Sequence, residues 1–375
     1  MSDIFGQPGG PFVSYAAESG VVKPASTYAA AGVDIDAGDR AVELMKASVA
    51  RASRPEVVGG LGGFAGLFRL DTARYRRPLL ATSTDGVGTK VAIAQAMDKH
   101  DTIGIDLVGM VVDDLVVCGA EPLFMTDYIA CGRVVPERIA MIVSGVAEGC
   151  RQAGCALVGG ETAEHPGLLK PDEYDLAGAG TGVVEEDAVL GAQRVREGDV
   201  VIAMASSGLH SNGYSLARHV LFTLAGWKLD RHVDELGGAL GEELLTPTRV
   251  YSQDCLALIN APDVDVHGFS HVTGGGLAAN LDRVLPAGVE VTIDRGSWRP
   301  APIFELIGTL GGVDGLELER TLNMGVGMVA LVASSDADRA LAVLTARGVQ
   351  AWAAGVVRAA AGGDAGRTEL VGSYA

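Results

Sequence analysis

Apolar residues along this chain gather in short runs that alternate with segments of helical composition. The run over 79–84 is apolar and β-branched, which predicts a buried strand. The segment over 91–97 that follows it predicts a helix capped by Thr89. A nearly continuous apolar run over 103–118 predicts a buried helix that ends at Gly119.

The alternation continues through the rest of the chain. We predict further strands at 122–131, 155–158, 175–184, 199–205, near Val266, up to Val332, and at 350–357. We predict further helices at 136–153, 277–285 and 336–347, and an earlier one that carries Val42, Met45 and Val49 and is capped by Asp39. The strand at 175–184 contains Gly178, Gly180 and Gly182, which are expected to permit close packing against another strand.

Length and composition divide the chain into four parts. At 375 residues the chain is long enough for two domains. Residues 1–26 are rich in Gly, Pro, Ser and Ala, which predicts a mobile arm, and charge rises near 185–198, which predicts a domain boundary. We therefore expect an N-terminal domain over 27–187, a C-terminal domain over 188–358 and a disordered tail over 359–375.

The net charge limits the kinds of partner. Asp and Glu number 47 against 29 Lys and Arg, which gives a net charge of −18 at pH 7. Nucleic-acid binding needs a basic face, so we expect no nucleic-acid partner. A phosphate site in this acidic chain has to be built from backbone amides, a few local cations and bound metal.

The cysteines and the apolar runs indicate the compartment. The cysteines form no Cys-x-x-Cys pair and lie in apolar segments: Cys118, Cys131, Cys150, Cys155 and Cys255. We expect buried free thiols in a reducing cytosol. No apolar run approaches the roughly 20 residues of a membrane span, and the first residues lack a signal-peptide pattern. We therefore expect a cytoplasmic protein with no membrane partner.

The turn after the first strand is the strongest candidate for a phosphate site. It reads Asp85-Gly86-Val87-Gly88-Thr89-Lys90 and opens a helix, so backbone N–H groups and the helix dipole face an anion. Asp85 is placed to hold Mg²⁺ beside that anion, and Lys90 to contact a phosphate oxygen. The spacing is neither that of the P-loop nor that of the dinucleotide fingerprint, and a tight turn with a surface lysine is the alternative.

Two further glycine clusters extend this pattern. The loop with Gly59, Gly60, Gly62 and Gly63 is either a flexible connector or a backbone cradle for ligand oxygen. Gly160 and Glu161 follow a buried strand, as Asp85 does. Two such strand ends are what a metal-bridged polyphosphate needs from opposite sides.

Three acids interrupt the apolar helix over 103–118. Asp106, Asp113 and Asp114 share one face of that helix with Met110. Unpaired carboxylates on such an element are costly, so these acids are metal ligands or solvated edge residues. Metal ligation is favoured for Asp114 over the other two.

Two polar loops in the second half are candidate substrate sites. The segment Ser207-Gly208-Leu209-His210-Ser211-Asn212 precedes a helix and either binds an oxyanion or phosphate or forms a polar surface turn. Thr273-Gly274-Gly275-Gly276 is a candidate anion nest. His271, on the strand before it, is either a hydrogen-bonded core residue or a site residue.

In this order, the motifs resemble the phosphoribosylformylglycinamidine cyclo-ligases, the aminoimidazole ribonucleotide synthetases of purine biosynthesis. The resemblance covers about residues 28–357 and rests on the segments 32–38, 59–64, 85–90, 114–122, 159–164, 206–215, 273–276 and 320–328. Each motif is moderately specific, and the ordered set is strongly so.

The resemblance implies a fold and a reaction. The fold is a cytoplasmic homodimer of two-domain α+β subunits, each domain a mixed sheet packed with helices, with the N-terminal domains pairing through their sheets. The reaction is the ATP-dependent cyclisation of formylglycinamidine ribonucleotide (FGAM) to 5-aminoimidazole ribonucleotide (AIR). It releases ADP and phosphate and proceeds through phosphorylation of the formyl amide oxygen.

Carried onto this sequence, the resemblance also implies roles for motif residues. Catalytic roles fall to Asp85, Lys90, Asp114 and His210, and Mg²⁺ is expected on Asp85, Asp114 and Glu161. ATP is expected on Gly59, Gly60, Gly62, Gly63, Asp85, Gly86, Gly88, Thr89, Lys90, Gly160 and Glu161. FGAM is expected on Ser207, Gly208, His210, Ser211, Asn212, Thr273, Gly274 and Gly275. The chain departs from the family's pattern at Ala29, where lysine is common, at Asp113, where asparagine is usual, and at His165, where methionine is common.

Related families fit less well. Selenophosphate synthetases carry a reactive cysteine or selenocysteine in an N-terminal glycine loop, and no cysteine precedes Cys118. The hydrogenase-maturation carbamoyl dehydratases need a C-terminal cysteine, whereas this chain ends in Gly-Ser-Tyr-Ala. Thiamine-monophosphate kinases are not expected to carry the motifs at 206–215 and 320–328. A non-catalytic nucleotide-binding protein of the same fold is the alternative from another class.

Overall fold

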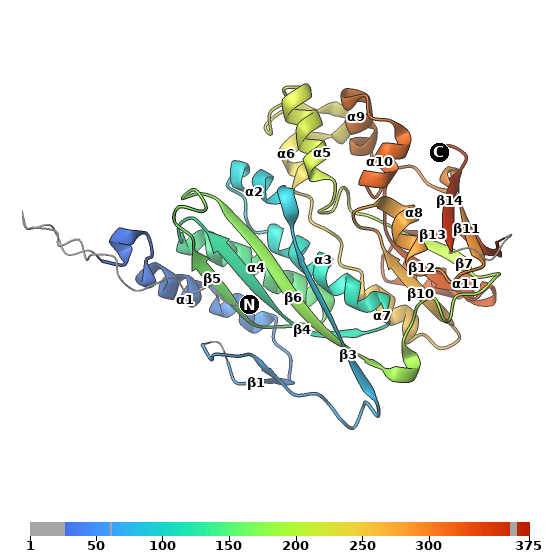
Figure 1. Cartoon of the computed structure of the whole chain (residues 1–375), viewed down its shortest axis with the longest axis horizontal. Helices are drawn as coiled ribbons and strands as arrows, with labels where there is room; N and C mark the ends of the chain where they lie inside the picture. Colours follow the sequence, from blue (N-terminus) through green and yellow to red (C-terminus); the bar gives the residue numbers. More distant parts are fainter. Residues whose placement is uncertain (1–26, 61, 361–365) are drawn as a thin grey trace, which may run out of the picture.

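The described chain folds around two main sheets, one of four strands and one of six, with helices packed on each (Figure 1). This computed structural model describes residues 27–60, 62–360 and 366–375, so the predicted arm over 1–26 lies outside the described residues. The mixed sheets and their helices confirm the expected α+β class.

The strands have the following bounds: β1 Val57–Val58, β2 Leu67–Phe68, β3 Pro78–Gly86, β4 Glu121–Cys131, β5 Ala156–Glu164, β6 Tyr174–Glu185, β7 Val200–Ala205, β8 His232–Val233, β9 Gly238–Ala239, β10 Val266–His271, β11 Val289–Asp294, β12 Val326–Val332, β13 Ala351–Ala359 and β14 Arg367–Val371. The α-helices are α1 Ile35–Arg51, α2 Val91–Met97, α3 Ile103–Val117, α4 Pro136–Ala153, α5 Tyr214–Arg218, α6 Leu240–Leu244, α7 Ser252–Ile259, α8 Gly276–Asp282, α9 Pro302–Gly311, α10 Gly315–Thr321 and α11 Ala337–Ala346.

The four-stranded sheet has the order β3-β6-β4-β5, with α3 and α4 packed on one face and α1 packed on α4 (Figure 1). Only the β4–β5 pair is parallel. Glycines on β6 let α3 approach closely, since a Cβ at Gly180 would lie 2.8 Å from a side-chain carbon of Val111. The close packing at Gly180 is therefore against a helix, whereas the sequence predicts close packing against another strand.

The six-stranded sheet has the order β10-β12-β7-β13-β11-β14 and is covered on both faces. Successive side chains of a strand point to opposite faces, so β7 serves two cores. Val201 and Ala203 belong to the core that includes residues of α8, whereas Ile202 and Met204 belong to the core that includes residues of α7 and α11. Every residue of β12 is buried as a result.

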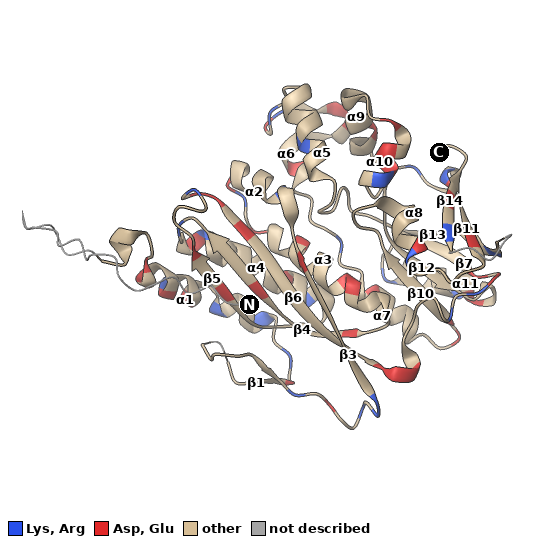
Figure 2. Cartoon of the chain, viewed as in Figure 1, with Lys and Arg blue, Asp and Glu red and all other residues tan. Residues whose placement is uncertain are grey.

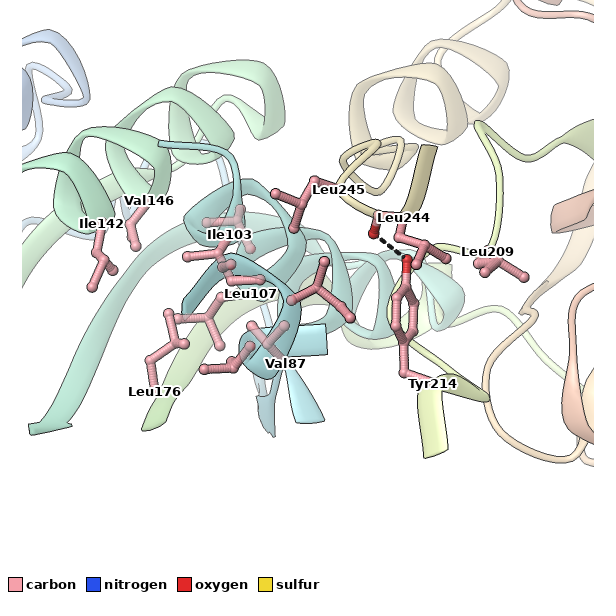
Figure 3. Close-up of a cluster of buried hydrophobic side chains, with 14 of the residues drawn as sticks. Val87, Ile103, Leu107, Ile142, Val146, Leu176, Leu209, Tyr214, Leu244 and Leu245 are labelled. Atoms are coloured by element: carbon pink, nitrogen blue, oxygen red, sulfur yellow. Dashed lines mark hydrogen bonds between the residues drawn. The ribbon is translucent and has the colours of Figure 1, made fainter. Parts of the chain in front are cut away.

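A shared hydrophobic core joins the two halves of the chain. Figure 3 shows Val87, Leu107 and Leu176 of the first half in one cluster with Tyr214 and Leu244 of the second. The Tyr214 hydroxyl donates to the carbonyl of Leu244 at 2.7 Å, which satisfies its buried polar atom. The two halves therefore pack against each other through apolar contact.

Most predicted elements are confirmed, with three local corrections. The predicted helix over 136–153 is α4 without any shift of its bounds. Asp34, not Asp39, caps α1, because its Oδ1 accepts the N–H of Ala37 at 3.1 Å. Thr89 makes no capping bond, because a 3-10 turn over Gly88–Lys90 precedes α2.

The prediction of a disordered tail over 359–375 is wrong for its last part. Strand β14 pairs in parallel with β11 at the edge of the six-stranded sheet. The ring of Tyr374 packs edge-on against Trp298, with centroids 5.2 Å apart. The end of the chain thus packs against the hydrophobic core that includes residues of α8.

All five thiols are free, as predicted, and four are buried, whereas Cys118 is only partly buried. Among the described residues, no helix is long and apolar enough to cross a membrane. Asp and Glu are spread over both halves, with Lys and Arg between them (Figure 2).

Candidate active site

The polar face of α3 is a wall between the two halves of the chain. Asp106 Oδ1 accepts the N–H of Thr248 at 2.8 Å and its hydroxyl at 2.6 Å. Both oxygens of Asp113 accept the N–H of Tyr251 at 3.0 Å. Asp114 Oδ1 lies 2.9 Å from His271 Nδ1. The three acids therefore share one face, as predicted. Asp106 and Asp113, however, accept hydrogen bonds from backbone N–H groups in the second half of the chain, so they are neither metal ligands nor solvated.

A cavity of about 340 Å³ lies where the two halves meet. The turn after β3, Met110 of α3 and the start of β6 line one side, and the loop before α5 lines the other. Five residues predicted to bind ligands from opposite halves line this cavity: Asp85, Gly86, Gly88, Ser211 and Asn212. We call it the transfer pocket.

Negative charge concentrates beside this pocket. Burial raises the pKa of Asp85, and the nearby Asp114 carboxylate raises it further, while the N–H of Gly86 and His271 oppose the shift. Burial also raises the pKa of Asp113 to about 7, against the opposing effect of His271. Burial alone lowers the pKa of His271, but the hydrogen bond with Asp114 and the surrounding carboxylates raise it overall. Asp85, Asp113 and Asp114 thus place three carboxyl groups around the buried His271.

A larger cavity of about 960 Å³ adjoins the transfer pocket, because Ala177 lines both. It is bounded by α1, the glycine loop and the edge of the sheet at β5. The predicted nucleotide-binding residues that line it are Gly60, Gly62, Gly63, Gly160 and Glu161. We call it the large pocket.

The three predicted metal ligands do not converge. Across the sheet, Glu161 of β5 pairs with Tyr128 of β4, and Tyr128 pairs with Ala177 of β6. Ala177 in turn pairs with Gly86 of β3. Three strand spacings separate these backbones by about 14 Å, so Glu161 and Asp85 do not share one ion. No group of three or more acidic, His or Cys side chains suited to a metal is found among the described residues. Of the three predicted ligands, Asp85 and Asp114 are the two that lie close to each other, since the charge of Asp114 raises the pKa of Asp85.

Lys90 is enclosed by protein, which disagrees with the prediction that it contacts a phosphate. Its side chain is 0% exposed. Nζ donates to Asp106 Oδ1 at 2.8 Å and to the carbonyls of His210 at 3.0 Å and Thr246 at 2.6 Å. An ammonium group has three N–H donors, and all three have partners here. Burial lowers the pKa of Lys90, and the charge of Asp106 opposes this.

His210 is also enclosed, which favours an orienting role over proton transfer. Its Nε2 accepts the N–H of Ser207 at 3.1 Å, and its buried Nδ1 has no partner among the described residues. Its backbone has φ +61°, a left-handed conformation that is strained for a residue other than glycine. Burial lowers the pKa of His210 well below its usual value, and nearby positive charges add to this.

The remaining predicted substrate residues form two neighbouring loops. A Cβ at Gly274 would lie 3.6 Å from Asn212 Oδ1, so the 273–276 loop adjoins the 207–212 loop. Ser207 uses its hydroxyl internally, donating to the carbonyl of Pro247 at 2.7 Å. Gly208 is buried, and its carbonyl accepts the side-chain amide of Asn323 at 2.9 Å. Thr89, on the first half, reaches this region with its hydroxyl 3.2 Å from that of Ser215.

Several residues at the site escaped sequence reasoning. Asn280 donates Nδ2 to the carbonyls of Thr273, Gly274 and Gly276, which fixes the glycine loop. Asp175 lines the transfer pocket from the start of β6. The position of Asp175 at the start of a predicted strand is its only local signal. No local sequence signal marks Asn280, because it lies within a helix.

Comparison with known proteins identifies the family. A model of the N-terminal domain of AIR synthase related proteins matches residues 65–184, and one of the C-terminal domain matches residues 196–366. A phosphoribosylformylglycinamidine cyclo-ligase of Anaeromyxobacter sp. (strain Fw109-5) is 53% identical over 337 residues, covering 90% of this chain and 97% of that one. The corresponding protein of Brevibacillus brevis is 52% identical over 332 residues, covering 88% and 95%. The chain belongs to the phosphoribosylformylglycinamidine cyclo-ligase family. It is therefore a ligase.

Solved structures share the fold at low identity. The thiamine-monophosphate kinase of Stenotrophomonas maltophilia superposes with a TM-score of 0.62 at 19% identity, covering 90% of this chain and 97% of that one. A hydrogenase maturation protein HypE in complex with ATP gives a TM-score of 0.59 at 20% identity, covering 89% and 91%. The cyclo-ligase family thus has a fold in common with these two kinds of protein.

Proposed function

We propose that this cyclo-ligase family member converts FGAM to AIR with consumption of ATP and release of ADP and phosphate. The names of its relatives support the overall reaction. The observation that carries the proposal is the transfer pocket, in which the turn after β3 faces the loop before α5. The predicted phosphate-binding and substrate-binding residues meet there.

We place the nucleotide mainly in the large pocket and its phosphate end at the turn after β3. The large pocket has the volume for a nucleoside and is lined by Gly60, Gly62 and Gly63, whose missing side chains leave backbone exposed. Ala177 borders both pockets, so a triphosphate extends from one to the other. A HypE of the same fold in complex with ATP supports nucleotide binding to this architecture.

Mg²⁺ fits the carboxylate pair of Asp85 and Asp114. Oxygen ligands suit this ion, and the two carboxylates lie close enough for the charge of Asp114 to add to the effect of burial in raising the pKa of Asp85. Bound there, the ion neutralises phosphate charge. Glu161 belongs to the large pocket, where it contacts the nucleotide or a separate ion.

The proposed reaction requires mainly that the reacting groups of ATP and FGAM are aligned. The formyl amide oxygen attacks the γ-phosphorus and ADP leaves; the ring-closing nitrogen then attacks the activated carbon and phosphate leaves. Phosphoryl transfer depends on positioning and charge neutralisation rather than on a protein nucleophile. The N–H groups at the turn after β3 are suited to phosphate oxygens, and Ser211 and Asn212 to the ribonucleotide.

Two measurements test the proposal. ADP release has to depend on added FGAM in a coupled assay. A heavy-oxygen label in the formyl amide of FGAM has to appear in the released phosphate. No FGAM-dependent ADP would overturn the reaction; ADP release without transfer of the label would overturn the phosphorylated-amide route alone.

We also propose that the protein is a cytoplasmic homodimer that pairs through the open face of the four-stranded sheet. Leu80, an apolar side chain exposed on this face outside the lining of the large pocket, supports the proposal.

A further inference from the structure

The ammonium group of Lys90 joins three separate segments of the chain. Its acceptors are Asp106 on α3, the carbonyl of His210 in the loop before α5, and the carbonyl of Thr246 after α6. The Tyr214 ring lies 5.5 Å from Nζ and closes the enclosure from a fourth direction. Lys90 itself ends the turn that lines the transfer pocket. One side chain therefore connects both walls of that pocket.

The bond to His210 holds a conformation that the loop does not prefer by itself. His210 has φ +61°, which costs a non-glycine residue stability unless the surroundings enforce it. Two bonds enforce it here, from Lys90 Nζ to the His210 carbonyl and from the Ser207 N–H to the His210 ring. Ser211 and Asn212, which line the pocket, follow directly along the chain.

We propose that Lys90 is a positioning residue, which fixes the 207–212 loop opposite the turn after β3 and so sets the width of the transfer pocket. The inference rests on the proposed function, because it assigns the ribonucleotide to that loop. It replaces the expectation that Lys90 binds ATP.

Loss of the Lys90 ammonium group should disturb mainly the wall of the transfer pocket that the 207–212 loop forms. The turn after β3 has its own anchors, since Val87 within it and Val91 directly after it are buried in the shared core. The 207–212 loop has one residue in that core, Leu209, and its other residues are polar or glycine and are held by hydrogen bonds such as those from Lys90 and Asn323. Loss of the ammonium group therefore disturbs ribonucleotide binding more than nucleotide binding.

A double variant separates this role from simple stabilisation. Lys90→Met alone leaves the buried Asp106 charge unpaired and lowers stability. Lys90→Met with Asp106→Asn removes both charges and keeps an acceptor for Thr248, so it regains stability but has no donor for the His210 carbonyl. We expect this double variant to melt above Lys90→Met but below wild type, because the carbonyls of His210 and Thr246 stay without a donor, with KM for FGAM at least tenfold higher and KM for ATP within threefold.

The matched control is Asp199→Asn. Asp199 and His267 form a buried pair 2.7 Å apart next to the start of β7, at the other end of that strand from the 206–208 loop. We expect KM for FGAM to be unchanged in this variant. A KM for FGAM that returns to normal in the double variant would overturn the positioning role, as would a rise in KM for ATP of equal size.

Hydrogen exchange gives a readout that needs no substrate. We expect amides over 207–213 to exchange at least tenfold faster in the double variant than in wild type, with no change over 79–88. Unchanged exchange over 207–213 would overturn the proposal whatever the assay shows. Absence of FGAM-dependent ADP release in wild type would instead count against the proposed function, leaving the exchange result to decide the role of Lys90.

Discussion

Asp114 combines the properties that a metal-binding carboxylate needs. Its side chain is 45% exposed, yet His271 Nδ1 holds one of its oxygens at 2.9 Å. A histidine that orients a carboxylate beside a metal is a common arrangement around such ligands. Asp85 supplies a second oxygen donor, close enough for the charge of Asp114 to raise the pKa of Asp85.

We expect Asp114→Asn to lower kcat about 100-fold or more, because the amide carries no charge to bind Mg²⁺. The free energy of unfolding should change by less than about 1 kcal/mol, since the side chain is 45% exposed and the amide still accepts a hydrogen bond from His271. ADP release and a thermal melt measure the two quantities. Near-normal turnover would remove Asp114 from the metal site.

Asp127 is a buried acid that sequence reasoning passed over. Burial raises its pKa to about 7, because the charged form is poorly solvated under the helices. Its carboxylate lies so close to Gly160 that a Cβ there would clash with Oδ1. The group is therefore neutral in the folded protein below neutral pH and charged in the unfolded chain above about pH 4.

This shift makes stability fall as pH rises. The folded state holds the proton more tightly, so its advantage is complete below the unfolded pKa and is lost as pH rises through about 7. Asp127→Asn removes the titration, and we expect the variant to gain up to about 4 kcal/mol over wild type at pH 8 but only about 1.5 kcal/mol at pH 5. Urea unfolding at both pH values measures this. An equal difference at the two pH values would contradict the assignment.

At the residue level, sequence reasoning found the polar groups at strand ends but not their partners. Asp85, Ser211 and Asn212 were predicted because their types and neighbours indicate phosphate chemistry, and all three line one cavity. Lys90 was misassigned because its acceptors lie 16, 120 and 156 residues away along the chain. Burial of a charge by distant segments leaves no local pattern.

At the scale of elements, α3 positions the site because it packs very tightly. A Cβ at Gly104 would lie 2.1 Å from the backbone nitrogen of Val146 and 2.6 Å from the carbonyl oxygen of Ile142. Backbone atoms of α4 have no rotamer by which to move aside. The helix is thereby fixed against α4, and its polar face is fixed toward the second half.

We expect Gly104→Ala to lower the free energy of unfolding by about 3 kcal/mol, because α3 and α4 have to separate to admit the methyl group. The matched control is Gly38→Ala in α1, where a Cβ meets nothing within 4 Å. There we expect a gain of about 0.5–1 kcal/mol from helix propensity. Chemical denaturation of both variants tests the packing argument, which would be wrong if the two variants shifted alike.

Elements with strong local signals were predictable and those held by tertiary contacts were not. Helix α4 begins at Pro136 and ends before Gly154, which has φ +71°, so both ends are encoded locally. Strand β14 is short and partly polar, and was taken for a disordered tail. It forms because β11 pairs with it and because Arg295 donates to the carbonyl of Leu370.

At the scale of the whole molecule, the helices among the described residues cover only one face of the four-stranded sheet. Gly180 lies opposite Ser83 and faces α3, so the alternate residues of β3 point away from the helices. Leu80 is one of these and is 66% exposed. Large apolar side chains on an open sheet face indicate a contact surface, which fits the proposed pairing of N-terminal domains.

We expect the wild-type protein to sediment as a dimer and Leu80→Lys to sediment as a monomer at the same concentration, because a charge in an apolar interface is costly to desolvate. Leu316→Lys on α10 is the matched control, since Leu316 is 65% exposed but lies on the other half of the chain. This control should remain dimeric. A monomeric wild type would disprove pairing altogether, whereas a dimer that tolerates Leu80→Lys but dissociates with Leu316→Lys would move the interface to the C-terminal half.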